Sequence, residues 1–237
     1  MGKLYIVSTP IGNLEDITLR AKRILEEVDI IACEDTRKTG MLLTKLTKVP
    51  PSSRWNLNKR PQFLSYYEEN ELQRIPEIIQ LLKEGKNVAL VSNAGTPTIS
   101  DPGFKLVREC LNQGVQVEAI PGSSAILTAL VSSGLPTDKF LFLGYLPKKQ
   151  GKRQELLKNC KLLTVHCTLI FFESPYRLLE TLKELREIFG DIDIVICREL
   201  TKIHEEIRRE KISQSILHFE KNPAKGEVTL LFNIPQG

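Results

Sequence analysis

The first half of the chain repeats one pattern, in which a short apolar run leads into a loop of small and polar residues and then into an amphipathic helix. The apolar run at residues 87–91 is followed by the loop Val-Ser-Asn-Ala-Gly-Thr-Pro-Thr-Ile-Ser-Asp-Pro-Gly at 91–103, and Phe104, Val107 and Leu111 then fall on one helical stripe. Glycines and prolines fix the shape of such a loop and let its backbone approach a ligand closely. An ordinary tight turn with a helix cap has a similar composition, so both interpretations stay open at this point.

Strand and helix patterns alternate in this way up to residue 120. The other strand patterns lie at residues 4–8, 29–33, 63–67 and 115–120, and the other helix patterns lie at 17–28 and 71–83. This spacing indicates a mostly parallel sheet that is covered by helices on both faces. Because ligands of such sheets bind at the carboxyl ends of the strands, we expect the loops there to carry the site.

The pattern changes after residue 121. A helix rich in small residues is predicted from 125 to 132, and strand patterns follow at 139–145, 169–172, 192–197 and 228–232, with a charged edge strand or hairpin arm at 205–209. This order predicts a mixed sheet with hairpin-type neighbours in the second half. A chain of 237 residues is long enough for one large domain or for two of roughly 120 residues each.

Several classes of protein and site are excluded by what the sequence lacks. No apolar run is long enough to span a membrane, and no signal-peptide pattern precedes the first strand, so we expect a cytoplasmic protein. The five cysteines form no close pair, and the three histidines match no metal spacing, so a disulfide framework and a metal site are not expected. The two standard phosphate-binding glycine motifs and a nucleophile elbow are also absent.

The remaining candidates are polar loops that follow predicted strands, together with the helix start at Ser123. The loops lie at residues 9–13, 34–37, 93–103, 172–175 and 198–202. Such a set suits an organic cofactor that is held mainly by backbone and hydroxyl groups between two domains.

A basic segment stands out between residues 146 and 161, where six lysines and arginines face one acid. The net charge of +4 is too small to imply a nucleic-acid partner, so the distribution of charge is the stronger observation. The segment is either a solvated helix face or a surface that binds phosphates. The residues proposed to bind RNA are Lys148, Lys149, Lys152 and Arg153. A further basic loop carries Arg54, Lys59 and Arg60 between residues 50 and 61.

Four motifs together resemble the small-subunit ribosomal RNA methyltransferases of the tetrapyrrole methylase superfamily. They are Ser-Thr-Pro-Ile-Gly-Asn-Leu-Glu-Asp-Ile-Thr at 8–18, Cys-Glu-Asp-Thr-Arg at 33–37, the loop at 93–103 and Arg-Glu-Leu-Thr-Lys at 198–202. The resemblance covers nearly the whole chain in order. It implies two α/β domains, 1–121 and 122–237, with S-adenosylmethionine bound in the cleft between them. It also implies a homodimer that methylates the ribose 2′-oxygen of a cytidine in the decoding region of small-subunit ribosomal RNA.

The resemblance also implies which residues contact the cofactor. They are Pro10, Gly95, Thr96, Pro97, Ile99, Ser100, Asp101, Ser124, Ala125, Phe172, Glu173, Leu200, Gly226 and Glu227. This sequence departs from the family's usual pattern at Asn93, where an aspartate is common. Tyr67, Glu69 and Tyr176 stand where the family often has histidine, which excludes a histidine base at these three positions.

Methyl transfer to a ribose hydroxyl needs alignment of the reacting atoms and a base for the hydroxyl proton. The carboxylates of Asp101, Glu173 and Glu199 are the candidate bases. Lys202 or Arg37 could orient a phosphate or stabilise the developing alkoxide. The alternative for Glu199 and Lys202 is a structural ion pair.

Two other functions are compatible with these motifs. One is a methyltransferase that acts on a small tetrapyrrole, which would share the fold. The other is a non-catalytic RNA-binding assembly factor that retains the cofactor pocket. The motif at 34–37 and the basic segment favour an RNA substrate over a tetrapyrrole.

Overall fold

The computed structural model describes residues 1–47, 61–163 and 166–234, and the chain divides into two compact units, Met1–Ser124 and Ala125–Gly237. The basic loop with Arg54, Lys59 and Arg60 lies outside the described residues. Among the described helices, none has the length and apolar character that crossing a membrane would require.

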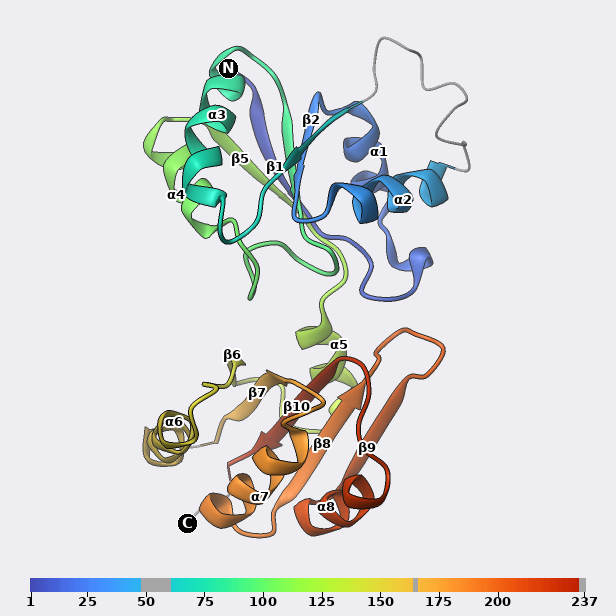
Figure 1. The fold of residues 1–237 in the computed structure, drawn as a ribbon, viewed down its shortest axis with the longest axis vertical. Helices are drawn as coiled ribbons and strands as arrows, with labels where there is room; N and C mark the ends of the chain where they lie inside the picture. The colour runs from blue at the N-terminus through green and yellow to red at the C-terminus, as the bar shows by residue number, and fades with distance from the viewer. Residues whose placement is uncertain (48–60, 164–165, 235–237) are drawn as a thin grey trace. The chain divides into compact units, whose positions relative to one another are not determined.

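The first unit contains a sheet of five described strands in the order β3-β2-β4-β1-β5, in which every neighbouring pair is parallel (Figure 1). The strands are β1 (Lys3–Val7), β2 (Ile30–Cys33), β3 (Gln62–Ser65), β4 (Val88–Val91) and β5 (Gln116–Ile120). A 3-10 turn, η1 (Leu14–Asp16), follows β1. The predicted parallel sheet is therefore confirmed.

Helices cover both faces of this sheet. They are α1 (Leu19–Glu27), α2 (Thr36–Thr47), α3 (Glu71–Lys83) and α4 (Phe104–Asn112). Consecutive residues of β4 alternate between two cores: Val88 and Leu90 pack with α3 and α4, whereas Ala89 and Val91 pack with α1 and α2. A strand that is buried on both faces must be apolar at every position, which is why β4 has the sequence Val-Ala-Leu-Val.

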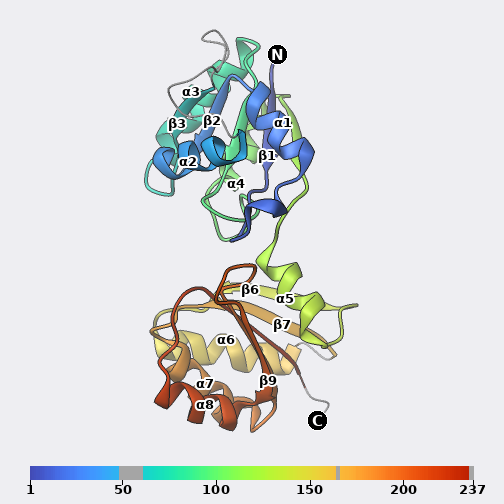
Figure 2. The same cartoon turned by 90° about the vertical axis from the view of Figure 1, so that its right-hand side faces the viewer.

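The second unit contains a mixed sheet in the order β6-β7-β10-β8-β9 (Figure 1, and turned by 90° in Figure 2). The strands are β6 (Phe140–Tyr145), β7 (Thr168–Glu173), β8 (Asp193–Arg198), β9 (Glu206–Lys211) and β10 (Val228–Asn233). The pair β6–β7 is parallel and the other three pairs are antiparallel, so the predicted mixed sheet is confirmed.

One face of the second sheet packs against α6 (Gln150–Leu163), α7 (Leu178–Phe189) and α8 (Ile212–Lys221), and α5 (Ala125–Ser133) packs against β7 and β10. Helix α8 was not predicted. Its core stripe of Ile212, Ile216 and Phe219 has helical spacing, but the helix follows β9 directly, with no loop residues to mark its start.

Candidate functional site

In the first unit, the loops after β1, β4 and β5 are held together by a continuous set of hydrogen bonds. Thr9 and Gly95 form an antiparallel bridge, with N–O distances of 2.8 Å and 3.0 Å. The Thr96 hydroxyl donates to the Ser123 carbonyl at 3.1 Å and therefore accepts its 2.9 Å hydrogen bond from Ser8. Three strand-end loops thus form one rigid edge, and Ser8, Thr9 and Ser123 support it without having been predicted as contact residues.

The loop after β4 has an unusual backbone. Gly95, Thr98, Ser100 and Gly103 all have positive φ angles, of 79°, 73°, 60° and 133°. Threonine and serine seldom adopt this left-handed conformation, because the side chain crowds the backbone. Such strain persists only where the surroundings impose it, and it concentrates at ligand sites. The backbone therefore favours the ligand-loop interpretation over that of an ordinary turn.

Gly103 is required for packing as well as for conformation. A Cβ atom at this position would lie 2.6 Å from Leu90 Cδ2 and 3.0 Å from Thr98 Cγ2. The close approach seats the start of α4 against the end of β4, and it leaves Ile99 and Ser100 exposed at the tip of the loop.

The carboxylate of Asp101 lies in the same loop and is half-buried. Burial raises the pKa of this carboxyl to about 6, with a further contribution from the nearby charge of Glu34 and an opposing one from a hydrogen bond with Ser92. A carboxyl with this pKa is a stronger base than an ordinary aspartate and is still ionised at neutral pH. Among the three predicted bases, Asp101 has the electrostatic environment that suits the task.

Glu34 connects the end of β2 to this loop. Its two carboxylate oxygens accept hydrogen bonds from the backbone N–H and from the side-chain amide of Asn93, each at 3.2 Å. An aspartate at position 93 has no amide to donate, so the asparagine suits the neighbouring Glu34. Asp35 accepts from the backbone N–H groups of Arg37 and Lys38 at the start of α2, and the Arg37 side chain is exposed.

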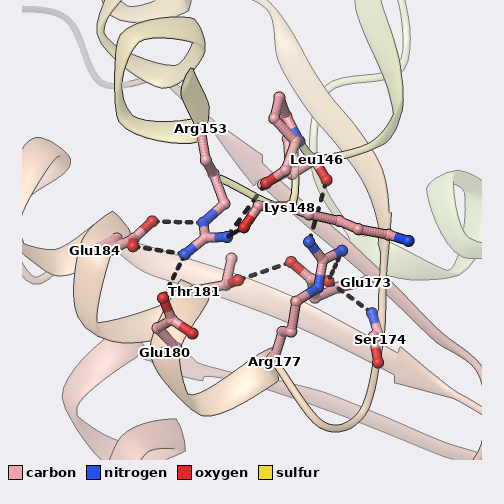
Figure 3. Close-up of polar contacts among 10 residues, drawn as sticks. Leu146, Lys148, Arg153, Glu173, Ser174, Arg177, Glu180, Thr181 and Glu184 are labelled. Atoms are coloured by element: carbon pink, nitrogen blue, oxygen red, sulfur yellow. Dashed lines mark hydrogen bonds and ion pairs between the residues drawn. The ribbon is translucent and has the colours of Figure 1, made fainter. Parts of the chain in front are cut away.

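Glu173, at the end of β7, is held by contacts within its own unit (Figure 3). Its side chain is completely buried. One carboxylate oxygen accepts from Arg177 at 2.6 Å and from the backbone of Ser174 at 2.7 Å, and the other accepts from the Thr181 hydroxyl at 2.7 Å. These contacts tie the carboxylate into the fold, and its role as a base stays a prediction.

Glu199 and Lys202 form an ion pair at 2.9 Å after β8, so the structural alternative predicted for them holds. Glu199 Oε1 also accepts from the backbone N–H of Glu227 at 2.9 Å, and Lys202 reaches Glu227 at 3.0 Å. The Glu227 hydrogen bond and the Lys202 ammonium lower the pKa of Glu199, which makes it a weaker base. A Cβ atom at Gly226 would lie 2.4 Å from Glu199, so this contact requires glycine.

Arg153 corrects the predicted RNA-binding set, because it is fully buried. Its Nε and Nη2 atoms donate to Glu184 at 2.7 Å each, and Nη2 also donates to Glu180 at 2.6 Å. Nη1 donates to the carbonyls of Pro147 and Lys148 at 3.2 Å each. Figure 3 shows this guanidinium enclosed by its partners. By contrast, the side chains of Lys148, Lys149 and Lys152 are exposed.

The predicted cofactor contacts gather at one loop edge of each sheet. In the first unit, Pro10 and the residues from Gly95 to Asp101 lie on the linked loops, and Ser124 directly precedes α5. In the second unit, Glu173, Arg198 and Val228 are neighbours in the strand register. Phe172, Leu200, Gly226 and Glu227 therefore lie at the same edge of that sheet, whereas Ala125 is the first residue of α5.

Comparison with known proteins extends these observations. The family described as tetrapyrrole (corrin/porphyrin) methylases matches residues 3–215. A protein of Thermotoga maritima named ribosomal RNA small subunit methyltransferase I is 49% identical over 98% of this chain and 99% of its own length. A protein of the same name from a Hydrogenobaculum species is 46% identical over 98% of this chain and 95% of its own.

Solved structures agree in fold. Uroporphyrin-III-C-methyltransferase from Thermus thermophilus superposes with a TM-score of 0.65 at 18% identity, covering 98% of this chain and 94% of that one. Cobalt precorrin-4 methyltransferase gives 0.64 at 19% identity, covering 97% of this chain and 94% of that one. The chain belongs to the tetrapyrrole methylase family and, within it, to the group of ribosomal RNA small subunit methyltransferase I proteins.

Proposed function

We propose that this protein transfers a methyl group from S-adenosylmethionine to small-subunit ribosomal RNA, at the ribose 2′-oxygen of a cytidine in the decoding region. The observation that carries this proposal is the near-full-length identity of 49% to a protein named as a methyltransferase of that RNA. The choice of the 2′-oxygen and of cytidine is the finer part of the proposal, and it follows from the motif resemblance alone.

The first unit supplies a loop that fits such a cofactor. Gly95 and its neighbours expose backbone and hydroxyl groups on a rigid frame, and Ile99, Ser100 and Asp101 stand at or near the tip of the loop. Apolar and polar groups side by side suit a ligand that combines an adenosine with an amino acid. S-adenosylmethionine, when bound, supplies the electrophilic methyl group. A complex of Thermus thermophilus uroporphyrin-III C-methyltransferase with S-adenosyl homocysteine, similar in fold, supports this class of ligand.

We propose that the residues at the loop edge of the second sheet contact the same cofactor. Phe172 is half-buried and Leu200 is buried, so they are candidates for apolar contacts. Gly226 and Glu227 are exposed and offer backbone and carboxylate groups. Because the Glu173 side chain is buried, a contact from this residue would come from its main chain.

Asp101 is the proposed base. Its task is to accept the proton of the ribose hydroxyl as the oxygen attacks the methyl carbon, and a pKa of about 6 places it near the ideal for a base at neutral pH. The Thr9–Gly95 bridge holds the start of the loop that carries this carboxylate. Arg37 is exposed near the end of β2 and is the proposed partner for an RNA phosphate.

The basic segment is the proposed contact with the RNA backbone. Lys148, Lys149 and Lys152 are exposed on the loop before α6 and on its first turns. Ammonium groups that neutralise phosphates release counterions, so binding should weaken steeply as salt rises. The net charge of +4 is modest, so we propose that these residues contribute through their local density.

We further propose that the protein works as a cytoplasmic homodimer. The motif resemblance is the support for this proposal, and α5 carries two exposed apolar residues one turn apart, Leu127 and Val131. Sedimentation equilibrium of the purified chain should give twice the mass of 26.9 kDa. A monomeric mass at micromolar concentration would contradict the dimer without affecting the proposed activity.

The decisive experiment is methyl transfer to small ribosomal subunits from a strain that lacks the modification. The purified protein, the subunits and S-adenosylmethionine with a labelled methyl group are incubated, and the labelled nucleotide is mapped. A label on a cytidine ribose in the decoding region is expected. In a parallel incubation with a tetrapyrrole in place of the subunits, label transfer to the tetrapyrrole would support the first alternative function. Stabilisation of the protein by the cofactor without any transfer to subunits would support the assembly-factor alternative.

A further inference from the structure

Strand β6 is an edge strand, and it ends in an irregularity that places an aromatic side chain on the sheet face opposite the main core. Phe142 pairs with Ile170 of β7, but the next pair is Tyr145 with Phe172, so β6 has one residue more than β7 in this interval. Gly144 absorbs the bulge with a φ of 66°. Because the extra residue reverses the alternation, Tyr145 falls on the same face as Phe142 and Phe172.

These three aromatic residues form a continuous group. The ring centroids of Phe172 and Phe142 are 5.0 Å apart, and those of Phe172 and Tyr145 are 5.5 Å apart. Leu143 packs against the opposite core of the sheet. Tyr145 ends the group and is 58% exposed, although Phe172 lies against one side of it. One side of its ring is supported by protein, while much of its surface is accessible to a ligand.

The residues after Tyr145 are fixed by two arginines, although the segment has no regular structure of its own. Arg177 donates to the Leu146 carbonyl at 3.3 Å, and Arg153 donates to the carbonyls of Pro147 and Lys148 at 3.2 Å each. Both guanidinium groups are in turn held by carboxylates, Arg177 by Glu173 and Arg153 by its two glutamate partners. We call residues 145–149 the clamped corner.

The clamped corner carries positive charge three and four residues after the aromatic ring. Lys148 and Lys149 are exposed, and in Figure 3 the Lys148 side chain extends away from the guanidinium of Arg153. The buried arginines therefore order the backbone, and the lysines keep their ammonium groups for a ligand. A site ordered in advance loses less conformational entropy on binding than a mobile one.

We propose that the clamped corner binds an unpaired segment of the substrate RNA, in which a base stacks on Tyr145 and the adjoining phosphates contact Lys148 and Lys149. An aromatic ring beside a cationic track is the combination by which proteins hold single-stranded nucleic acid. Duplex RNA would leave the exposed ring without a base to stack on, since its bases are already stacked. This inference rests on the proposed function and adds the form of RNA that this surface recognises.

The first test replaces Tyr145 and measures binding of the full-length protein to a single-stranded fragment of the decoding region. Tyr145→Leu should weaken binding by about five-fold to a hundred-fold, the usual range for loss of one stacked base. Tyr145→Phe keeps the ring and should bind like the wild type. A duplex of the same length should show no difference between the variants. Affinity for S-adenosylmethionine, measured by calorimetry, should be the same in all three proteins.

The second test addresses the clamp. In Arg153→Met/Glu184→Met, the buried pair becomes apolar, so the fold is expected to survive while two carbonyls of the corner lose their donor. We expect a higher KM for the subunit with little change in kcat. Adding Lys148→Ala and Lys149→Ala should cost less in this background than in the wild type. Lys158→Ala, on the same helix but outside the corner, is the matched control for charge.

The outcomes separate this inference from the proposed function. If wild-type protein binds and methylates the subunit but Tyr145→Leu binds the single strand as tightly as Tyr145→Phe, the stacking role is overturned. A loss of cofactor affinity in Tyr145→Leu equal to the loss of RNA affinity would also overturn it, because the ring would then belong to the cofactor site. If wild-type protein neither binds nor methylates the subunit, the proposed function itself fails.

Discussion

The ionised carboxylate of Asp101 should destabilise the folded protein. Replacing Asp101 by asparagine should therefore raise the free energy of unfolding and, at the same time, abolish methyl transfer. The pKa of this carboxyl is about 6 in the folded chain against an ordinary value of 3.8, because burial and the charge of Glu34 disfavour the ionised form. Raising this pKa from 3.8 to about 6 corresponds to at most about 3 kcal/mol, and screening by solvent at this half-buried site reduces that figure. Asp101→Asn removes the charge and should regain up to that amount.

The sign of the pH dependence follows from proton binding. The folded state holds the Asp101 proton up to a higher pH than the unfolded state, so this residue's contribution to stability falls as the pH rises from about 3.8 to about 6. The advantage of Asp101→Asn over the wild type should therefore be small near pH 4 and should grow with pH, to about 3 kcal/mol at most above pH 7.

The assay is urea denaturation of both proteins at several pH values, followed by circular dichroism, with methyl transfer measured in parallel. Asp101→Ala is a useful companion variant, because it removes the same charge without keeping the shape. A stability difference that does not change between pH 4 and pH 8 would refute the assignment of a raised pKa. Substantial methyl transfer by Asp101→Asn would refute the role of this residue as the base.

Three further predictions concern other residues. Glu34→Gln should lower the pKa of Asp101, so the acidic limb of the kcat/KM profile should move to lower pH; an unmoved limb would show that the two carboxylates do not interact in the working enzyme. Gly226→Ala should destabilise the protein by roughly 1–3 kcal/mol in urea denaturation, because its φ of 79° and the 2.4 Å approach to Glu199 leave no room for a methyl group; wild-type stability would contradict this. Arg153→Met alone should cost about 3–5 kcal/mol, since its glutamate partner would remain buried and unpaired; a loss below about 1 kcal/mol would mean that the cluster is open to water.

The parallel sheet was predictable because of how its strands are buried. β2 and β4 lie between two helix layers, so consecutive residues face opposite cores and every position is apolar. Helix α1 was equally predictable, because Ala21, Ile24 and Leu25 form an apolar stripe with helical spacing. Helix α8 was missed because no glycine, proline or capping residue separates it from the charged strand β9.

The candidate site was only partly predictable. The glycines and prolines of the loop after β4 marked it as a ligand loop, but nothing in the sequence showed that Thr98 and Ser100 would be left-handed. The reason lies in distant partners, because the loop is held by Thr9, by Ser8 through Thr96 and by the chain before α5.

The charged residues show most clearly what the sequence alone does not predict. Glu173 and Asp101 are both carboxylates at strand ends, and the sequence offered both as bases. The Glu173 carboxylate is buried, and it is paired with Arg177 and hydrogen-bonded to Thr181. The pKa of Asp101 is instead raised by burial and by the charge of Glu34. Similarly, Arg153 stands among exposed lysines in the sequence but is buried in the fold.

The sequence by itself determined the order of the strands and of most helices, the loops that carry the site and the resemblance to a family, because periodicity and motif spacing are local properties. The tertiary structure alone decided which charges are structural and which are accessible to a substrate. Whether a charged group is buried depends on partners brought close by folding, such as Glu184, which lies 31 residues from Arg153. Burial and opposite charge then set each group's protonation and exposure.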